Sequence, residues 1–178
     1  DSKEYITTYT YNNLGKLSSV TEQLSDDPEN PQESVIRFFY DDKGNLTGTI
    51  DAEGNKTSHE YDTFNRRVKT KRHLKDGTYI LTSFSYYPTG KLESVTDAKG
   101  NKTRYDYDDE QRLKKVVFPD NTFTEVTYTE IPDEENPDKI YKSVWVKQRN
   151  GTTVKNRYDE LNRLTFRQVI PAAGVEGP

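Results

Sequence analysis

The sequence predicts an all-β fold in which tandem antiparallel hairpins form a twisted, curved ribbon of sheet. Three features predict it. A seven-residue block recurs along the chain, apolar and aromatic residues alternate with polar ones before each block, and most blocks hold a Gly or Asn where a short turn needs one. Several blocks are 21 residues apart, as at Tyr40 and Tyr61 or at Tyr86 and Tyr107. One repeat is therefore expected to be two strands and two turns.

Each block begins with Tyr, all but one have Gly or Asn four residues later, and all but one end with Leu two residues after that. The Leu-ended blocks begin at Tyr11, Tyr40, Tyr86, Tyr107 and Tyr158, and they end at Leu17, Leu46, Leu92, Leu113 and Leu164. A further block begins at Tyr61 and has Arg67 in place of Leu. We expect these Tyr and Leu residues to form the core of the repeats.

The strand before each Tyr is predicted from its alternation. Ile36, Phe38 and Tyr40 share one face at period two, and polar residues occupy most positions between such residues in the other repeats. After the Tyr, Gly and Asn tolerate the left-handed backbone of a tight turn, and Gln111 is less suited to that position.

The return strand begins at the Leu that ends each block. Val20 follows Leu17 by three residues, and Val116 follows Leu113 by three. Period two cannot place both members of such a pair on one face, so we expect a β-bulge or a strong twist between them.

The remaining loops and the limits of the array follow from turn residues. Residues 51–57 and 97–103 are near copies with Asp first and Gly fourth, which favours a type I turn, and Asn150-Gly151 is a hairpin signal. The longer intervals predict loop insertions near residues 25–34 and 131–138. The repeat array is expected over residues 1–170, and residues 171–178 are expected to be a linker or a disordered tail.

Composition restricts the class of protein. Leu, Ile, Val and Phe make up about 20% of the 178 residues, but the net charge is only −4 and 13 Tyr add buriable area, which favours a thin folded core over disorder. There is no Cys, so neither a disulfide framework nor thiolate chemistry is available. No apolar run predicts a membrane helix and no signal peptide is seen. The polar start at Asp1 is interpreted as that of a processed or excised piece.

These blocks resemble the YD repeats of the Rhs (rearrangement hotspot) protein family. The resemblance rests on Tyr-Asp-x-x-Asn/Gly-Arg/Lys-Leu followed by Thr-Asp-x-x-Gly-Asn, and it covers roughly residues 5–169. The family includes bacterial polymorphic toxins, wall-associated proteins, the shells of Tc toxins and animal teneurins.

The resemblance implies that the sheet is a fragment of a spiral or shell, a non-enzymatic scaffold that often encloses a toxin. The array is shorter than such shells. Family members that release a toxin carry Asp-Pro-x-x-Gly motifs, whereas Asp27-Pro28 here is followed by no Gly, so no self-cleavage is carried over. Adhesion in teneurins and an association with carbohydrates imply a second type of role.

No catalytic or metal-binding residues are predicted. His59 and His73 lack Cys partners, and the acidic clusters lack the ligand spacing of a calcium loop. The basic run from Arg66 to His73 could bind nucleic acid or an acidic glycan, but it favours a solvated, guarded sheet face over either. Aromatic residues outside the anchors are the candidates for a ligand-binding surface, and they are Tyr79, Tyr87, Tyr141 and Trp145.

The sequence therefore predicts a structural repeat module of a secreted or cell-surface bacterial protein, acting as a scaffold for toxin encapsulation or surface display. The alternative is an extracellular module that binds carbohydrate or protein. Expected partners are the rest of a longer YD-repeat polypeptide or another copy joined through sheet edges, with a glycan or protein ligand in the alternative. No cofactor, nucleic acid or membrane insertion is expected.

Overall fold

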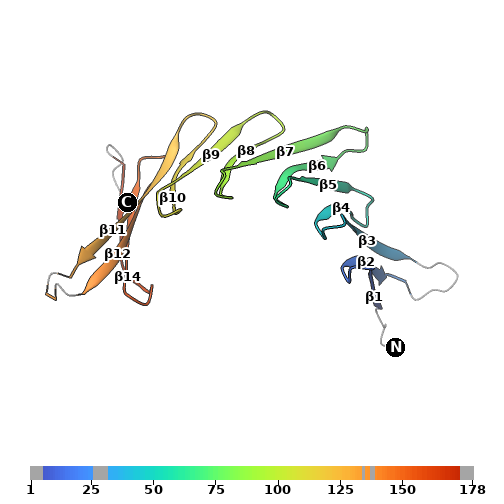
Figure 1. Ribbon diagram of the computed structural model, residues 1–178, viewed down its shortest axis with the longest axis horizontal. Helices are drawn as coiled ribbons and strands as arrows, with labels where there is room; N and C mark the ends of the chain where they lie inside the picture. Colours follow the sequence, from blue (N-terminus) through green and yellow to red (C-terminus); the bar gives the residue numbers. More distant parts are fainter. Residues whose placement is uncertain (1–5, 26–31, 134, 137–138, 173–178) are drawn as a thin grey trace. The chain divides into compact units, whose positions relative to one another are not determined.

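The computed structural model describes residues 6–25, 32–133, 135–136 and 139–172. Within these ranges the chain is all-β, with fourteen antiparallel strands in one open sheet whose order follows the sequence, as predicted (Figure 1). No helix occurs in the described part of the chain, and so none is available to span a membrane. The strands are β1 Thr7–Tyr11, β2 Leu17–Gln23, β3 Glu33–Tyr40, β4 Leu46–Ile50, β5 Lys56–Tyr61, β6 Arg67–His73, β7 Tyr79–Tyr86, β8 Leu92–Thr96, β9 Lys102–Tyr107, β10 Leu113–Val117, β11 Phe123–Pro132, β12 Ile140–Lys147, β13 Thr153–Tyr158 and β14 Leu164–Ile170.

The internal contacts divide the chain into two compact units. Unit 1 comprises Asp1–Ser85 with Thr96–Gly100, and unit 2 comprises Tyr86–Val95 with Asn101–Pro178. Both units are built from the predicted hairpins, and in most of these a strand ending at Tyr pairs with a strand beginning at Leu.

The β-bulge expected after the Leu is present in the hairpins of both units. In the first hairpin Tyr11 pairs with Leu17 and Thr10 pairs with Ser19, so Ser18 is the extra residue. The same shift occurs beside Tyr40, Tyr61, Leu113 and Tyr158. The bulge resets the alternation, so that the Leu and the Val three residues later both lie on the face of the Tyr.

An Asp carboxylate organises the turn that follows the Tyr. In the turn after Tyr40, Asp41 Oδ1 accepts hydrogen bonds from the backbone N–H groups of Lys43 and Asn45 at 3.0 and 2.8 Å, and Asn45 Nδ2 donates to Oδ2 at 2.9 Å. The Asn45 amide is the main cause that holds the pKa of Asp41 below its usual value. The carboxylate thus stabilises a turn whose fourth residue, Gly44, has a φ of 82°.

The left-handed position is filled by Gln in one turn, as the sequence predicted. Gln111 has a φ of 63°, where an L-residue with a Cβ costs about 1–2 kcal/mol relative to the right-handed region. Gly90 takes the equivalent position in the preceding block, at a φ of 86°, without that cost.

A tyrosine hydroxyl joins neighbouring hairpins in both units. The ladder between β4 and β5 has three residue pairs, Gly48 to Ile50 with Lys56 to Ser58, so the Tyr61 end of β5 lies beyond it. There Tyr61 Oη donates to the Leu46 carbonyl at 2.8 Å. In unit 2 Tyr128 Oη donates in the same way to the Leu113 carbonyl at 3.1 Å. Tyr rather than Phe is needed for this link.

The expectation of a buried Tyr/Leu core requires correction. Among described residues Val154 is the one hydrophobic residue that counts as buried, and the anchors from Leu17 to Tyr158 are half-buried. Tyr11 and Leu164 are exposed, at 64% and 52%. The physical reason is that an open sheet has solvent on both faces, and that β1 and β14 each have a neighbouring strand on one side only.

The predicted insertions and tail fall partly outside the described residues. Residues 26–31, 134, 137–138 and 173–178 are not described. Inside the predicted insertions, Glu33 and Ser34 belong to β3, and Ile131 and Pro132 belong to β11. The second long interval is therefore mainly a longer hairpin, in which β11 continues four residues beyond Tyr128.

Candidate functional site

The extended β11–β12 hairpin forms one side of a hollow of about 610 Å³ in unit 2. The strands that precede the turns of the Tyr blocks end at the Tyr of the block, but β11 runs past Tyr128 to Pro132. The hairpin therefore presents additional residues beside the turns that follow β9 and β13. The lining comprises Glu110, Arg112, Tyr128, Thr129, Glu130, Lys142, Ser143, Val144, Tyr158 and Asn162.

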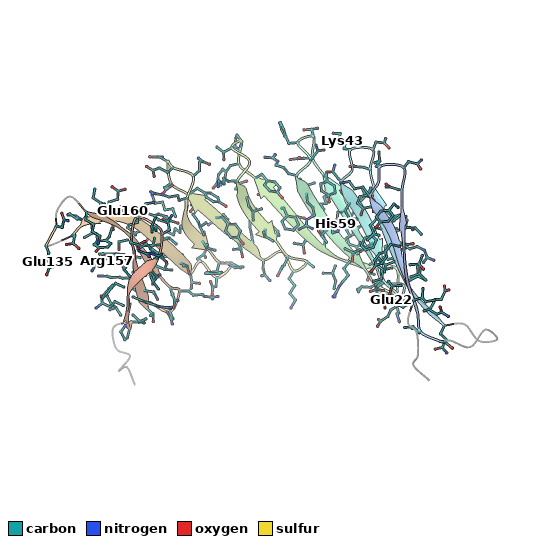
Figure 2. The ribbon with its side chains drawn as sticks, turned by 90° about the horizontal axis from the view of Figure 1, so that it is seen from below. Glu22, Lys43, His59, Glu135, Arg157 and Glu160 are labelled. Carbon is teal, nitrogen blue, oxygen red and sulfur yellow. The ribbon has the colours of Figure 1, made fainter. Side chains whose placement is uncertain are left out.

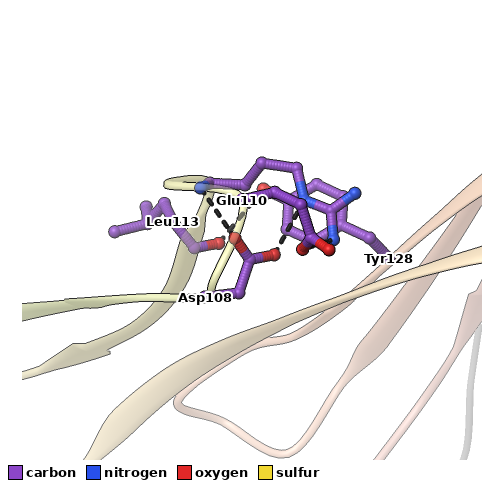
Figure 3. Close-up of polar contacts among 5 residues, drawn as sticks. Asp108, Glu110, Leu113 and Tyr128 are labelled. Atoms are coloured by element: carbon purple, nitrogen blue, oxygen red, sulfur yellow. Dashed lines mark hydrogen bonds and ion pairs between the residues drawn. The ribbon is translucent and has the colours of Figure 1, made fainter.

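Arg112 lies in one wall of this hollow, and Figure 3 shows its partners Asp108 and Glu110 with the Tyr128 ring. Its Nε donates to Asp108 Oδ2 at 2.7 Å and its Nη2 donates to Glu110 Oε2 at 2.8 Å. Its guanidinium carbon lies 4.4 Å from the centre of the Tyr128 ring, a cation–π distance. Partial burial acts against ionisation of Asp108, but hydrogen bonds from Arg112 keep the pKa of that carboxyl below its usual value. The wall is therefore a charged, preorganised network.

The opposite wall carries amide and phenol groups. Lys142 Nζ lies 3.4 Å from Asn162 Oδ1, and Tyr158 lines the hollow beside Val144. The lining contains two carboxylates, Glu110 and Glu130, and two cations, Arg112 and Lys142. Its net charge is therefore zero. A concave surface with aromatic rings and a few polar groups has the character of a small-molecule site, and here it is suited to a neutral, hydroxyl-rich ligand.

The four aromatic residues predicted as a ligand surface do not lie together. Tyr79 is 50% exposed and contacts the His73 ring, with ring centres 6.2 Å apart. Tyr87 is half-buried against Tyr107, at 6.1 Å and nearly perpendicular. The other two, Tyr141 and Trp145, are half-buried on β12. The sequence did not identify the residues that line the hollow, apart from the anchor Tyr158. Only the long interval from Tyr128 to Tyr158 indicated that part of the chain.

The two histidines have hydroxyl neighbours. His59 Nδ1 lies 3.0 Å from Thr70 Oγ1, and His73 Nε2 lies 2.9 Å from Ser58 Oγ. Burial, with a smaller contribution from the positive charge of Arg67, lowers the pKa of His59. No group of three or more His, Asp or Glu residues suited to a metal occurs within the described ranges. Both histidines are therefore placed to form hydrogen bonds between the adjacent strands β5 and β6.

Two carboxylates pair with part of the basic run from Arg66 to His73, which lies on β6 beside β5, the strand of His59 (labelled in Figure 2). Lys69 and Lys71 reach Glu60 at 2.8 and 2.6 Å, and these hydrogen bonds lower the pKa of Glu60 to about 2. Arg66 pairs with Asp62 at 2.7 Å. Two carboxylates are thus set against the five Lys and Arg residues of this run, so these pairs offset only part of its positive charge.

Comparison with known proteins identifies the repeats. Residues 40–79 and 86–122 match the RHS Repeat family. Similar solved structures are TcdB2-TccC3-Cdc42, with 14% identity, 90% of this chain covered and a TM-score of 0.35, and TcdB2-TccC3 without its hypervariable C-terminal region, with 14% identity, 89% covered and the same TM-score. The chain spans 11% of the length of each of those chains. No curated protein matches the sequence.

Proposed function

Because this chain belongs to the RHS repeat family, we propose that it is a scaffold segment in the wall of a longer secreted or cell-surface bacterial polypeptide. A structural repeat module is what the family and the tandem hairpins support. In the proposed role the segment contributes sheet to toxin encapsulation or surface display and has no catalytic residues of its own.

The observation that carries the proposal is the pair of one-sided end strands. β1 pairs with β2, and β14 pairs with β13, and each has its other edge open among the described strands. All five residues of β1 and all seven of β14 are exposed. An open strand edge is a template for a further strand. The proposed partner is the rest of a longer YD-repeat polypeptide or, in its absence, a second copy of this chain.

We expect the isolated chain to self-associate through these edges at high concentration. Changing Thr7 and Thr8 to Lys should weaken the association, because charges on an edge strand oppose strand pairing. Thr10 is left unchanged because its hydroxyl lies within hydrogen-bond distance of Ser18 and Ser19. Light scattering and sedimentation over a concentration series measure the effect.

The matched control is Thr127→Lys on β11, which has a strand on both sides. Its association should equal that of the unchanged chain. A strict monomer at millimolar concentration, or the same weakening in Thr127→Lys and the β1 variant, would contradict the edge proposal.

The alternative proposal is a carbohydrate- or protein-binding module. The hollow in unit 2, whose lining has no net charge, supports a neutral oligosaccharide as its ligand. Lys142→Ala should then weaken oligosaccharide binding several-fold in titration calorimetry, whereas Lys114→Ala on β10, outside the lining, should not. Absence of binding to a panel of neutral glycans would refute this alternative and leave the scaffold role intact.

A further inference from the structure

The register of unit 2 places basic and aromatic side chains together on one face of the sheet. Directly paired residues share a face, as do residues two apart along a strand. From Lys115 on β10 to Phe166 on β14 this rule connects one continuous row of side chains. We name six residues of this row the basic aromatic face, and they are Lys115, Phe123, Trp145, Lys155, Arg157 and Phe166.

Each cation of the basic aromatic face lies over one of its rings, at a cation–π distance. The distances to the ring centre are 3.9 Å for Lys155 Nζ over Trp145, 4.0 Å for Lys115 Nζ over Phe123 and 5.1 Å for the guanidinium carbon of Arg157 (labelled in Figure 2) over Phe166. The aromatic rings therefore hold the positive charges at fixed places on the sheet.

Apolar side chains are exposed between these cations. Phe166 is 43% exposed and Phe123 is 36% exposed. Ile170, 37% exposed, lies on the same face, because it pairs with Thr153, two residues before Lys155. The face thus combines fixed positive charge with apolar surface that is open to solvent.

Positive charge is in excess on this face. One carboxylate, that of Glu125, lies on the face among β10 to β13, where it pairs in register with Lys115 and Lys147. The cations there are Lys115, Lys147, Lys155 and Arg157, and within the described part of the chain none of them belongs to an ion pair. The face is therefore positive, although the whole chain has a net charge of −4.

The other charges near this face lie at its borders. On β9 Asp106 and Arg104 lie on the same face and offset each other. Asp133 and Glu160 are near Lys139, at the end of the β11–β12 hairpin. The excess positive charge is therefore centred on β12 and β13, around Trp145.

Unit 1 provides the contrast. There Lys71 lies over the Tyr79 ring at 5.4 Å, but Glu60 binds Lys71 at 2.6 Å. A pair of ring and cation is thus present in both units. In unit 1 a carboxylate occupies this cation, whereas the cations of the basic aromatic face keep their charge for an external anion.

We propose that the basic aromatic face binds the surface of an anionic lipid bilayer. The phosphate oxygens of the lipid headgroups would accept hydrogen bonds from its cations, and Phe123, Phe166 and Ile170 would enter the boundary between headgroups and acyl chains. Aromatic rings and the stems of basic side chains are favoured at that depth. The contact is peripheral, and it depends neither on the scaffold role nor on the hollow.

The arrangement of rings and cations favours a bilayer over a nucleic acid. Bases bind such surfaces mainly by stacking on aromatic rings. Here a cation already lies over each ring, so a base would have to displace it. A bilayer needs no stacking, because cations can bind its phosphates while the exposed apolar side chains are buried among its lipids.

Trp145, the single Trp of the chain, reports on this face directly. Vesicles made of equal parts phosphatidylglycerol and phosphatidylcholine should shift its fluorescence emission to shorter wavelength, as an indole ring does when it leaves water. Added salt should weaken the effect, because exposed charges are screened. Vesicles of phosphatidylcholine alone should give no comparable shift.

One set of variants tests the charge. Arg157→Gln should raise the lipid concentration for half-maximal binding about fivefold, the contribution of one basic residue near an anionic surface. Arg157→Lys, which keeps the charge, should bind like the unchanged chain. Arg167→Gln is the matched control, because Arg167 pairs with Asn156 on the opposite face of the same two strands, and it should change binding far less. Sedimentation with vesicles measures all three.

A second pair of variants tests the apolar contact. Phe166→Ala should weaken binding to the anionic vesicles several-fold, because it removes an exposed ring from the face. Val169→Ala is its control on the same strand. Val169 is 55% exposed but pairs with Val154 on the opposite face, so its loss should leave binding unchanged.

Several outcomes would overturn the proposal. These are equal binding to neutral and anionic vesicles, no shift in Trp145 emission, or equal weakening in Arg157→Gln and Arg167→Gln. Tighter binding of single-stranded DNA than of anionic vesicles would assign the face to nucleic acid instead. Circular dichroism checks that each variant keeps its strands, and if Arg157→Gln loses them, the comparison of Phe166→Ala with Val169→Ala decides. Edge-mediated association, measured without lipid, tests the scaffold role separately.

Discussion

Tyr61→Ala is expected to lower the free energy of unfolding by about 2–3 kcal/mol, below the 3–5 kcal/mol typical of a fully buried aromatic residue because the ring is half-buried. The ring lies in the sheet opposite Arg67, and its hydroxyl donates to the Leu46 carbonyl at 2.8 Å. Removing it takes away apolar contact and the link between two hairpins. Urea denaturation followed by circular dichroism measures the loss.

Two further variants separate these contributions. Tyr61→Phe keeps the ring and loses the hydroxyl, so it should cost about 1 kcal/mol. Tyr9→Ala removes the same side chain from the edge strand β1, where it is 56% exposed, and should cost clearly less than Tyr61→Ala. Equal losses for Tyr9→Ala and Tyr61→Ala would show that position in the repeat does not determine the contribution of the ring.

The hairpins could be predicted because their rules are local. Seven residues are enough to indicate the end of a strand, a turn and the start of the return strand. The signal is a Tyr, a residue in the left-handed backbone conformation and a Leu at fixed spacing. The three-residue step from Leu17 to Val20 predicted the bulge, since no regular strand places both on one face. Even the unfavourable Gln111 could be recognised, because the left-handed conformation is a property of one residue.

Burial could not be predicted in the same way. Alternation identifies which side chains share a face, but it does not say what covers that face. We expected Tyr11 and Leu164 in a core, and both are exposed because no second layer in the described part of the chain covers the sheet and each lies on an end strand. Covering layers depend on the complete fold, which a period of two does not encode.

The sequence named Tyr141 and Trp145 as surface candidates but could not predict the side chains beside them, because these depend on the register between strands. The run from Arg66 to His73 is the most basic segment, yet Glu60 neutralises Lys69 directly across the hairpin. In contrast, Lys155 and Trp145 come together from different strands, with a turn between them. Only a register prediction through the Asn150-Gly151 turn could have paired them.

Deleting residues 51–71 is expected to leave a cooperatively folded protein with reduced stability. The 21 deleted residues equal one repeat, the interval from Tyr40 to Tyr61. Arg72 would follow Ile50 on the alternate face, as Asp51 does now, so β4 would continue into the turn at residues 74–78. Since stacked repeats contact mainly their neighbours, stability should fall by roughly one repeat and its interface. Urea denaturation and far-UV circular dichroism measure the result.

A deletion one residue shorter is the matched control. Removing residues 51–70 would place Lys71 directly after Ile50. These two residues now share a face of the sheet, so they cannot be neighbours in a regular strand. The one-residue slip would turn every following side chain to the wrong face until a bulge absorbed it. This variant should be far less stable than the 21-residue deletion, although it retains more of the chain. If the two variants were equally stable, or if only the shorter deletion folded, the unit of this fold would not be the 21-residue hairpin repeat, and stability would depend on contacts that reach beyond neighbouring hairpins.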